Sequence, residues 1–218
     1  MRWAALLKGV NVGGNRKLPM ADLRATVEAL GWRDVRTLLA SGNVVFDCDE
    51  GDEAAVVAQV EASLAAIGLK TDVMARDLAA IEAAIAANPF PDAAKARPQH
   101  LLVHFHRNAF PATLLDRVPT IYDGPERLHA IGRELFVDYP AGIGDSRLHL
   151  ATAKLGFPKC VTARNWNTVL KFRAMLADQV RMSHPDPFVS SEVEKQATGG
   201  TQGVSTSLDT NGGGDESV

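Results

Sequence analysis

Three short polar segments of this chain carry the residue types that hold anionic groups. They are residues 8–17 (KGVNVGGNRK), residues 41–43 (SGN) and residues 162–168 (TARNWNT). Glycine lets the backbone approach a ligand closely, lysine and arginine supply positive charge, and asparagine and hydroxyl side chains supply hydrogen bonds. None of the three segments matches a motif with an assignable reaction. We therefore predict a ligand-binding surface and assign no catalytic residue.

The segment 8–17 lies between an apolar run and a predicted helix, where free backbone N–H groups can hold an anion. Its Gly9 and Gly14 have the spacing of a nucleotide-binding Walker A loop, but Asn15 and Arg16 replace the Lys-Ser/Thr pair of that motif. The alternative is a tight connection whose asparagines bond only to the loop backbone. The predicted ligand-binding residues of this segment are Lys8, Asn11, Gly13, Gly14, Arg16 and Lys17.

The segment 41–43 has the composition of a turn between two strands. Ser41 and Asn43 are predicted to line the ligand site. Ser41 is not expected to act as a nucleophile, because neither a positioned base nor a G-x-S-x-G elbow accompanies it.

In the segment 162–168, the pattern predicts the start of the last helix, with Thr162 as the N-cap and Ala163 as the first helical residue. The exposed N–H groups of that helix, together with Arg164, would suit a phosphate or carboxylate. On this placement, Lys17→Ala and Arg164→Ala should leave folding stability nearly unchanged while removing stabilisation by the ligand. The predicted ligand-binding residues here are Arg164, Asn165, Asn167 and Thr168.

The histidines suggest a metal site, which we weigh against a plain sheet surface. His100, His104 and His106 fall on one face of a predicted strand over residues 99–106, and His129 is placed on a neighbouring strand. No carboxylate or cysteine stands at a fixed spacing from them, so we interpret this face as solvent-facing and predict no metal and no cofactor.

Composition places the chain among ordinary globular proteins, with 218 residues, of which 46% are hydrophobic. Two distant cysteines and an apolar start too short for a signal peptide predict a cytoplasmic protein without a membrane segment. The net charge of −3 is uneven, because residues 183–218 contribute −5 and leave residues 1–182 at +2. That polar, glycine-rich end is predicted to be a disordered tail.

Hydrophobic periodicity predicts an α+β fold of two lobes. Residues 1–76 read as β-α-β-β-α-β, a ferredoxin-like unit whose first strand spans residues 3–10. Residues 77–182 read as a second, less regular α+β lobe, and the proline-rich stretch 89–98 reads as a linker. The elements predicted in the second lobe are helices near 78–85, 112–117, 146–155 and from 163, with strands at 99–106, 127–131 and 134–138.

Several motifs, in this order, resemble the bacterial family catalogued as domain of unknown function 1697. They are LKGVNVGG at 7–14, LPM at 18–20, SGNVVF at 41–46, YPAGIGDS at 139–146 and TARNWNT at 162–168. The resemblance covers nearly all of residues 1–180 and none of the tail. It implies a duplicated ferredoxin-like architecture and no established activity, substrate or cofactor.

These observations favour binding of a small anionic ligand through the three polar segments. Two alternatives stay open: an enzyme in which Lys8, Arg16 or Arg164 stabilises developing negative charge, and a homo-oligomeric module paired through sheet edges. Single-stranded nucleic acid is a weaker candidate, because the charge excess is small and no strand carries alternating aromatic residues. The oligomeric state is not predicted.

Overall fold

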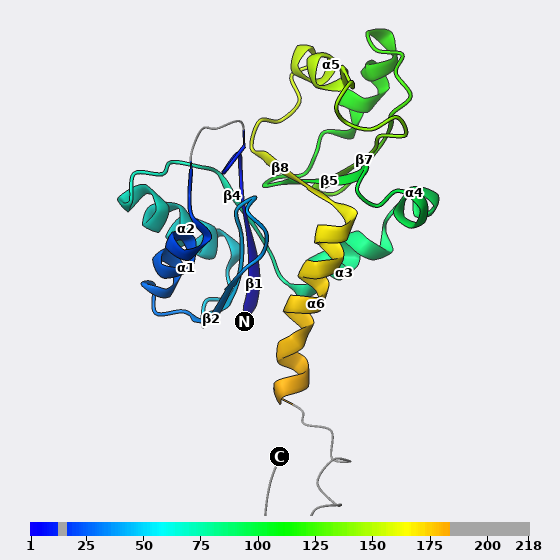
Figure 1. Ribbon diagram of the computed structural model, residues 1–218. Coiled ribbons are helices and arrows are strands. Elements are labelled where there is room, and N and C mark those ends of the chain that lie inside the picture. Colours follow the sequence, from blue (N-terminus) through cyan, green and yellow to red (C-terminus); the bar gives the residue numbers. More distant parts are fainter. Residues whose placement is uncertain (13–16, 184–218) are drawn as a thin grey trace, which may run out of the picture. The chain divides into compact units, whose positions relative to one another are not determined.

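A computed structural model describes residues 1–12 and 17–183 (Figure 1). Three of the predicted ligand-binding residues, Gly13, Gly14 and Arg16, lie outside the described residues. The predicted disordered tail, residues 183–218, also lies outside the described residues, except for Ser183.

The first lobe is built on a four-stranded antiparallel sheet with the strand order β2-β3-β1-β4. Its elements follow each other as β-α-β-β-α-β, which confirms the prediction. They are β1 (Arg2–Leu7), α1 (Met20–Glu28), β2 (Arg33–Thr37), β3 (Asn43–Asp47), α2 (Glu53–Ala66) and β4 (Val73–Arg76).

The second lobe repeats this topology. Its antiparallel sheet has the order β6-β7-β5-β8, so each strand takes the place of its counterpart in the first sheet. A 3-10 helix replaces the first helix of the repeat. The elements are β5 (Leu101–His106), η1 (Ala112–Thr120), β6 (Arg127–Ile131), β7 (Glu134–Asp138), α5 (Leu148–Lys154) and β8 (Val161–Asn165). The predicted α+β fold of two ferredoxin-like lobes is therefore confirmed.

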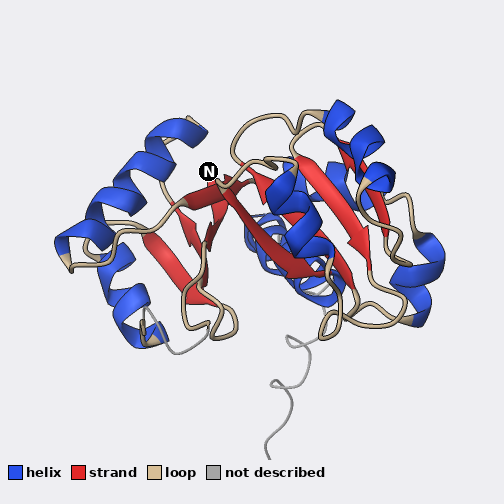
Figure 2. Ribbon diagram, turned by 90° about the horizontal axis from the view of Figure 1, so that it is seen from above, coloured by secondary structure: helices blue, strands red, loops and turns tan. Residues whose placement is uncertain are grey.

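Three further helices, α3 (Leu78–Ala86), α4 (Pro91–Ala96) and α6 (Trp166–Ser183), complete the fold. In Figure 2 helices lie on both sides of the sheets. The stretch 89–98 is not a plain linker, because it contains α4, which begins at Pro91, a residue suited to a first helical turn. None of the helices in the described part of the chain is long and apolar enough to cross a membrane.

The last helix begins later than predicted. Residues 161–165 form β8, whose burial alternates along the strand, and α6 starts only at Trp166. Burial of every second residue is the period of a β-strand, and β8 pairs with β5. Residues 163–165 are therefore in a strand, although their local sequence is compatible with the start of a helix. The first strand also ends early, at Leu7, because Gly9 and Asn11 take positive φ values of 62° and 56° and turn the chain.

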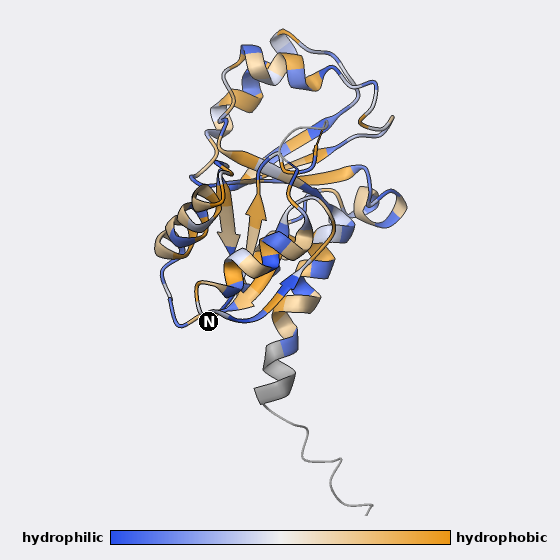
Figure 3. Cartoon of the chain, turned by 60° about the vertical axis from the view of Figure 1, so that its left-hand side comes forward, coloured by the Kyte–Doolittle hydropathy of each residue, from blue (hydrophilic) through white to orange (hydrophobic). Residues whose placement is uncertain are grey.

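Hydrophobic residues pack on both faces of the two sheets. Figure 3 shows the strands coloured largely as hydrophobic. One core cluster lies between the first sheet and α1 and α2. A second is shared by both lobes, because it joins Leu6 and Met74 of the first sheet to Val103 of the second and to Phe172 of α6. A third lies under α5 and η1. Residues 1–183 thus form one compact unit.

Candidate functional site

Two of the predicted polar segments, 41–43 and 162–168, meet at the side chain of Arg164, which is 7% exposed, together with Leu7, the residue before the first segment. Its Nη2 donates to the carbonyl oxygens of Leu7 (2.9 Å), Ser41 (2.9 Å) and Gly42 (3.2 Å). Its Nε donates to Asn43 Oδ1 at 2.5 Å. The remaining nitrogen, Nη1, donates to Thr162 Oγ1 (2.6 Å) and to the Ala163 carbonyl (2.8 Å).

Every nitrogen of this guanidinium is therefore occupied by an acceptor of the protein itself. Placing Arg164 in the first turn of a helix was wrong, since it lies in β8 and points into the junction between the lobes. Burial lowers the pKa of Arg164 to about 10, so the group stays charged at neutral pH. Its donors hold the fold together and are not free for an anion or for stabilising developing charge.

The first lobe carries the counterpart of this arginine. Arg76 is the fourth residue of β4, as Arg164 is of β8, and it is fully buried. Its Nη2 donates to the carbonyl of His106, the last residue of β5, as Arg164 donates to that of Leu7, the last residue of β1. Its Nε donates at 2.9 Å to Glu134, the first residue of β7, as Arg164 donates to Asn43, the first residue of β3.

Two arginines thus connect the lobes reciprocally. The sequence holds a signal of this repeat, because Val73–Arg76 (VMAR) and Val161–Arg164 (VTAR) match at three of four positions. Aligning the two would have predicted β8 and a shared role for both arginines.

The other amide side chains also serve the fold. Asn43 is fully buried, and its Nδ2 donates to the Leu38 carbonyl (2.7 Å) and to Ser41 Oγ (3.0 Å). Asn11 Nδ2 donates to the carbonyls of Leu18 (2.9 Å) and Ala40 (2.7 Å). Asn11 therefore behaves as in the alternative interpretation, in which the loop asparagines bond to backbone.

At the start of α6, the cap is Asn165 and not Thr162. Asn165 Oδ1 accepts from the backbone N–H of Thr168 at 3.0 Å and from its hydroxyl at 2.8 Å. Asn167 is exposed, as is Lys17 of the first segment. Of the predicted ligand-binding residues that the structure describes, only Lys8, Lys17 and Asn167 present their polar groups to solvent without a role in holding the backbone.

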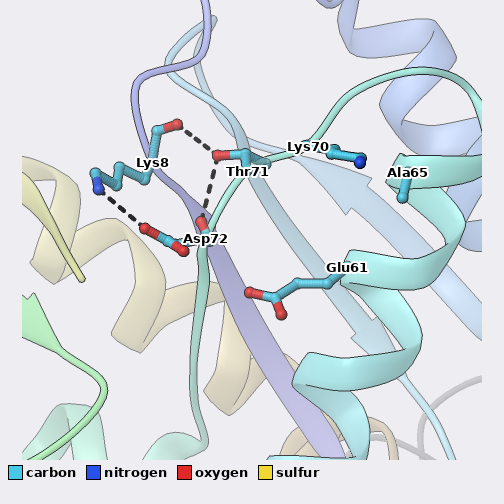
Figure 4. A pocket seen from close by; sticks show the side chains of 6 residues that line it. All are labelled: Lys8, Glu61, Ala65, Lys70, Thr71 and Asp72. Carbon is cyan, nitrogen blue, oxygen red and sulfur yellow. Dashed lines mark hydrogen bonds and ion pairs between the residues drawn. The ribbon is translucent and has the colours of Figure 1, made fainter. Parts of the chain in front are cut away.

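Lys8 lies at an open hollow of about 380 Å³ next to the end of β1 (Figure 4). Its Nζ contacts Asp72 Oδ2 at 2.9 Å, and both side chains are more than a third exposed to water. The hydroxyl of Thr71 donates to the Lys8 carbonyl at 2.6 Å and fixes the backbone there. The hollow is lined by Lys8, Glu61, Ala65, Lys70, Thr71 and Asp72.

The two lysines and two carboxylates of the lining balance, and Arg107, which pairs with Glu61 from outside the lining, leaves one cation in excess. Glu61 forms an ion pair with Arg107, and Asp72 forms one with Lys8. Lys70 is exposed and forms no ion pair with any of the described residues. The sequence analysis missed residues 70–72, because only the register of β1 on β4 brings them beside Lys8.

The histidine-bearing face of β5 does not face solvent, so that prediction was wrong. His106 is 3% exposed and His104 is half-buried, because α5 and the segment after it cover this face. His129 is on β6, separated from β5 by β7, and is exposed. In residues 1–12 and 17–183, no three metal-binding side chains lie close enough together to hold an ion.

The imidazoles of His104 and His106 are both neutral at physiological pH. Burial lowers the pKa of His106 to about 4, with a contribution from the charge of Arg76. Burial also lowers the pKa of His104 to about 4, with a contribution from His106.

Acid is expected to destabilise the protein through His106. A histidine of the unfolded chain titrates near 6.5, so the unfolded state takes up protons first as the pH falls. The stability that depends on neutral His106 is complete above about pH 6.5 and is lost as the pH falls toward 4. Between pH 7.5 and 5, wild type should lose roughly 1 to 2 kcal/mol more free energy of unfolding than His106→Phe. Urea denaturation at each pH measures this difference. The control variant His129→Phe should lose as much free energy of unfolding over this pH range as wild type does. Equal losses in wild type and His106→Phe would contradict the role of neutral His106.

Comparison with known proteins places the fold and leaves the activity open. A conserved bacterial protein from Streptococcus pneumoniae has a similar structure, with a TM-score of 0.63 and 24% sequence identity over 80% of this chain and 98% of that chain. No curated protein matches the chain. The family described as "Protein of unknown function (DUF1697)" matches residues 1–136, a shorter range than the resemblance over 1–180 suggested. The match spans more than half of the 218 residues, and the chain belongs to this family.

Proposed function

We propose that the protein binds a small anionic ligand, one bearing a phosphate or carboxylate, in the hollow beside Lys8 and Lys70. The observation that supports this most is the excess cation of the hollow, since both carboxylates there already have a basic partner and Lys70 has none among the described residues. An anion placed there would meet two ammonium groups at the cost of one weak ion pair.

The Lys8–Asp72 pair is weak enough to be opened by a ligand. Ion pairs between solvent-exposed side chains typically contribute only about 0.2 to 1 kcal/mol, because water screens them. Both partners are more than a third exposed here. Asp72 therefore acts as a counter-ion that an incoming phosphate or carboxylate replaces at the Lys8 ammonium group.

The two residues of this pair should have opposite effects on binding. We expect Lys8→Ala to weaken binding of inorganic phosphate or pyrophosphate, and Asp72→Asn to strengthen it by about two- to fivefold, the value of an exposed ion pair expressed as affinity. Lys70→Ala should weaken binding as Lys8→Ala does. Isothermal titration calorimetry of each variant with both anions measures these changes.

A matched control separates this site from general surface charge. Lys95 is exposed on α4 and does not line the hollow, so Lys95→Ala should bind both anions as wild type does. Lys8→Ala and Asp72→Asn both remove the same ion pair. If binding changed only because that pair stabilises the fold, the anion affinity of both variants would therefore change in the same direction. Equal weakening in both variants, or in Lys95→Ala, would reject the site.

A further inference from the structure

A second pocket, of about 380 Å³, lies in the second lobe between the sheet and α5. Its volume falls in the range of sites that hold small molecules. Most of its lining is apolar, with Leu135 and Val137 of β7 on one side and Leu148 of α5 and Phe157 on the other. Two polar side chains of β5, His104 and His106, lie in the wall formed by the sheet.

Among residues 1–12 and 17–183, no group forms a hydrogen bond with either ring nitrogen of His106, although the residue is 3% exposed. His104 Nε2 is also buried without a partner. The ring of His106 instead packs on Phe110, with 5.2 Å between ring centroids. Buried polar side chains in folded proteins almost always have a partner, and these nitrogens of the pocket wall have none among the described residues.

The protonation state of the two histidines defines what they recognise. Both imidazoles are neutral near pH 7, and a neutral imidazole offers one N–H donor and one acceptor nitrogen. A charged group would be poorly solvated against the apolar wall. The matching ligand is therefore an uncharged, flat ring with donors and acceptors on its edge, and any charged substituent would extend to the rim, where Lys159 is exposed.

We propose that this pocket binds the ring of an uncharged nitrogen heterocycle of nucleobase size, whose edge hydrogen-bonds to His106 and His104 while its faces contact the apolar side chains. This site is separate from the hollow at Lys8 and shares no lining residue with it.

The test compares two heterocycles of similar size. Adenine carries donors and acceptors around its edge, whereas indole has one N–H donor and no ring acceptor. Wild type should bind adenine or uracil saturably, and should bind indole at least about tenfold more weakly than adenine, because indole leaves buried imidazole nitrogens unpaired. Ligand-observed NMR titration measures all three affinities.

Two variants separate the proposed contact from a general effect on folding. His106→Phe keeps a ring beside Phe110 but removes both nitrogens, and should lose adenine binding at least about tenfold while retaining the fold. Ala153→Phe places a ring at an exposed lining position of α5, and should exclude adenine by filling the pocket. His129→Phe, on the exposed side of β6, should bind adenine as wild type does.

Loss of adenine binding in both pocket variants, with phosphate binding at Lys8 unchanged, would support the proposal. Absence of binding by adenine and uracil at millimolar concentration would overturn it and leave water as the partner of these nitrogens. Adenine binding that survives in His106→Phe, or indole binding as strong as adenine binding, would overturn it as well. Neither result would affect the proposed anion site.

Discussion

Replacing Arg164 with methionine is expected to lower the free energy of unfolding by at least about 3 kcal/mol. Methionine keeps much of the apolar volume but donates no hydrogen bond. The carbonyls of Leu7, Ser41 and Gly42 and the amide oxygen of Asn43 would lose their shared donor inside the junction of the lobes. A buried acceptor left unpaired typically costs about 1 to 3 kcal/mol. Urea denaturation followed by circular dichroism measures the loss.

Two further variants test whether the forked shape of the guanidinium matters as well as its charge. Arg164→Lys keeps the charge but supplies a single nitrogen, which cannot reach both Asn43 and the Leu7 carbonyl as the guanidinium does, so it should recover only part of the loss. Lys171→Met changes an exposed residue of α6 and should alter stability by no more than about 0.5 kcal/mol. Wild-type stability in Arg164→Met would show that Arg164 is free for a ligand, as the sequence alone suggested.

The second large effect is expected for Arg76→Met, with a loss of about 3 to 5 kcal/mol, the usual cost of removing one partner of a buried ion pair. Arg76 is fully buried, and its Nε and Nη2 donate to Glu134 (2.9 Å) and to the His106 carbonyl (2.7 Å) across the junction. Burial lowers the pKa of Arg76, and the neighbouring Glu134 opposes that shift. Without the arginine, Glu134 would keep a mostly buried charge with less compensation.

A double-mutant cycle with Glu134→Gln isolates this contact. The combined variant should be less destabilised than the sum of the two single variants, because the neutral amide no longer needs the lost cation. Denaturant unfolding of the four proteins gives the coupling energy. Strict additivity would mean that Arg76 acts through its other contacts, with the Ala75 and His106 carbonyls and with Glu53, and not through Glu134.

Much of the fold could be predicted because it is encoded locally. The apolar run of β1, the helical spacing in α1 and α2 and the turn at Ser41–Gly42 each depend on neighbouring residues, and together they predict the first lobe. The hairpin of β6 and β7 around Gly132 was predicted for the same reason. The strand β8 was not, because its sequence is compatible with a helix start and its pairing partner, β5, lies more than 50 residues away.

The site depended far less on local sequence. Composition identified the polar segments and the basic residues, and the structure brings two of the segments, and Leu7 just before the third, together around Arg164. Composition could not say which polar groups would bond to other parts of the protein, because Leu7, Ser41, Gly42 and Asn43, which accept from Arg164, lie more than 120 residues earlier in the chain. Nor could it place Asp72 beside Lys8 or cover the histidines of β5 with α5.

The sequence by itself determined most of the elements, the β-α-β-β-α-β order of the first lobe and the family, since local periodicity and short motifs carry that information. Only the tertiary structure decided the roles of the two buried arginines, the excess charge at Lys70 and the pocket floored by His104 and His106. The physical reason is that the pattern of apolar and polar residues in a sequence indicates which face of an element is covered. The segment that covers it is set by strand pairing and by packing between distant parts of the chain.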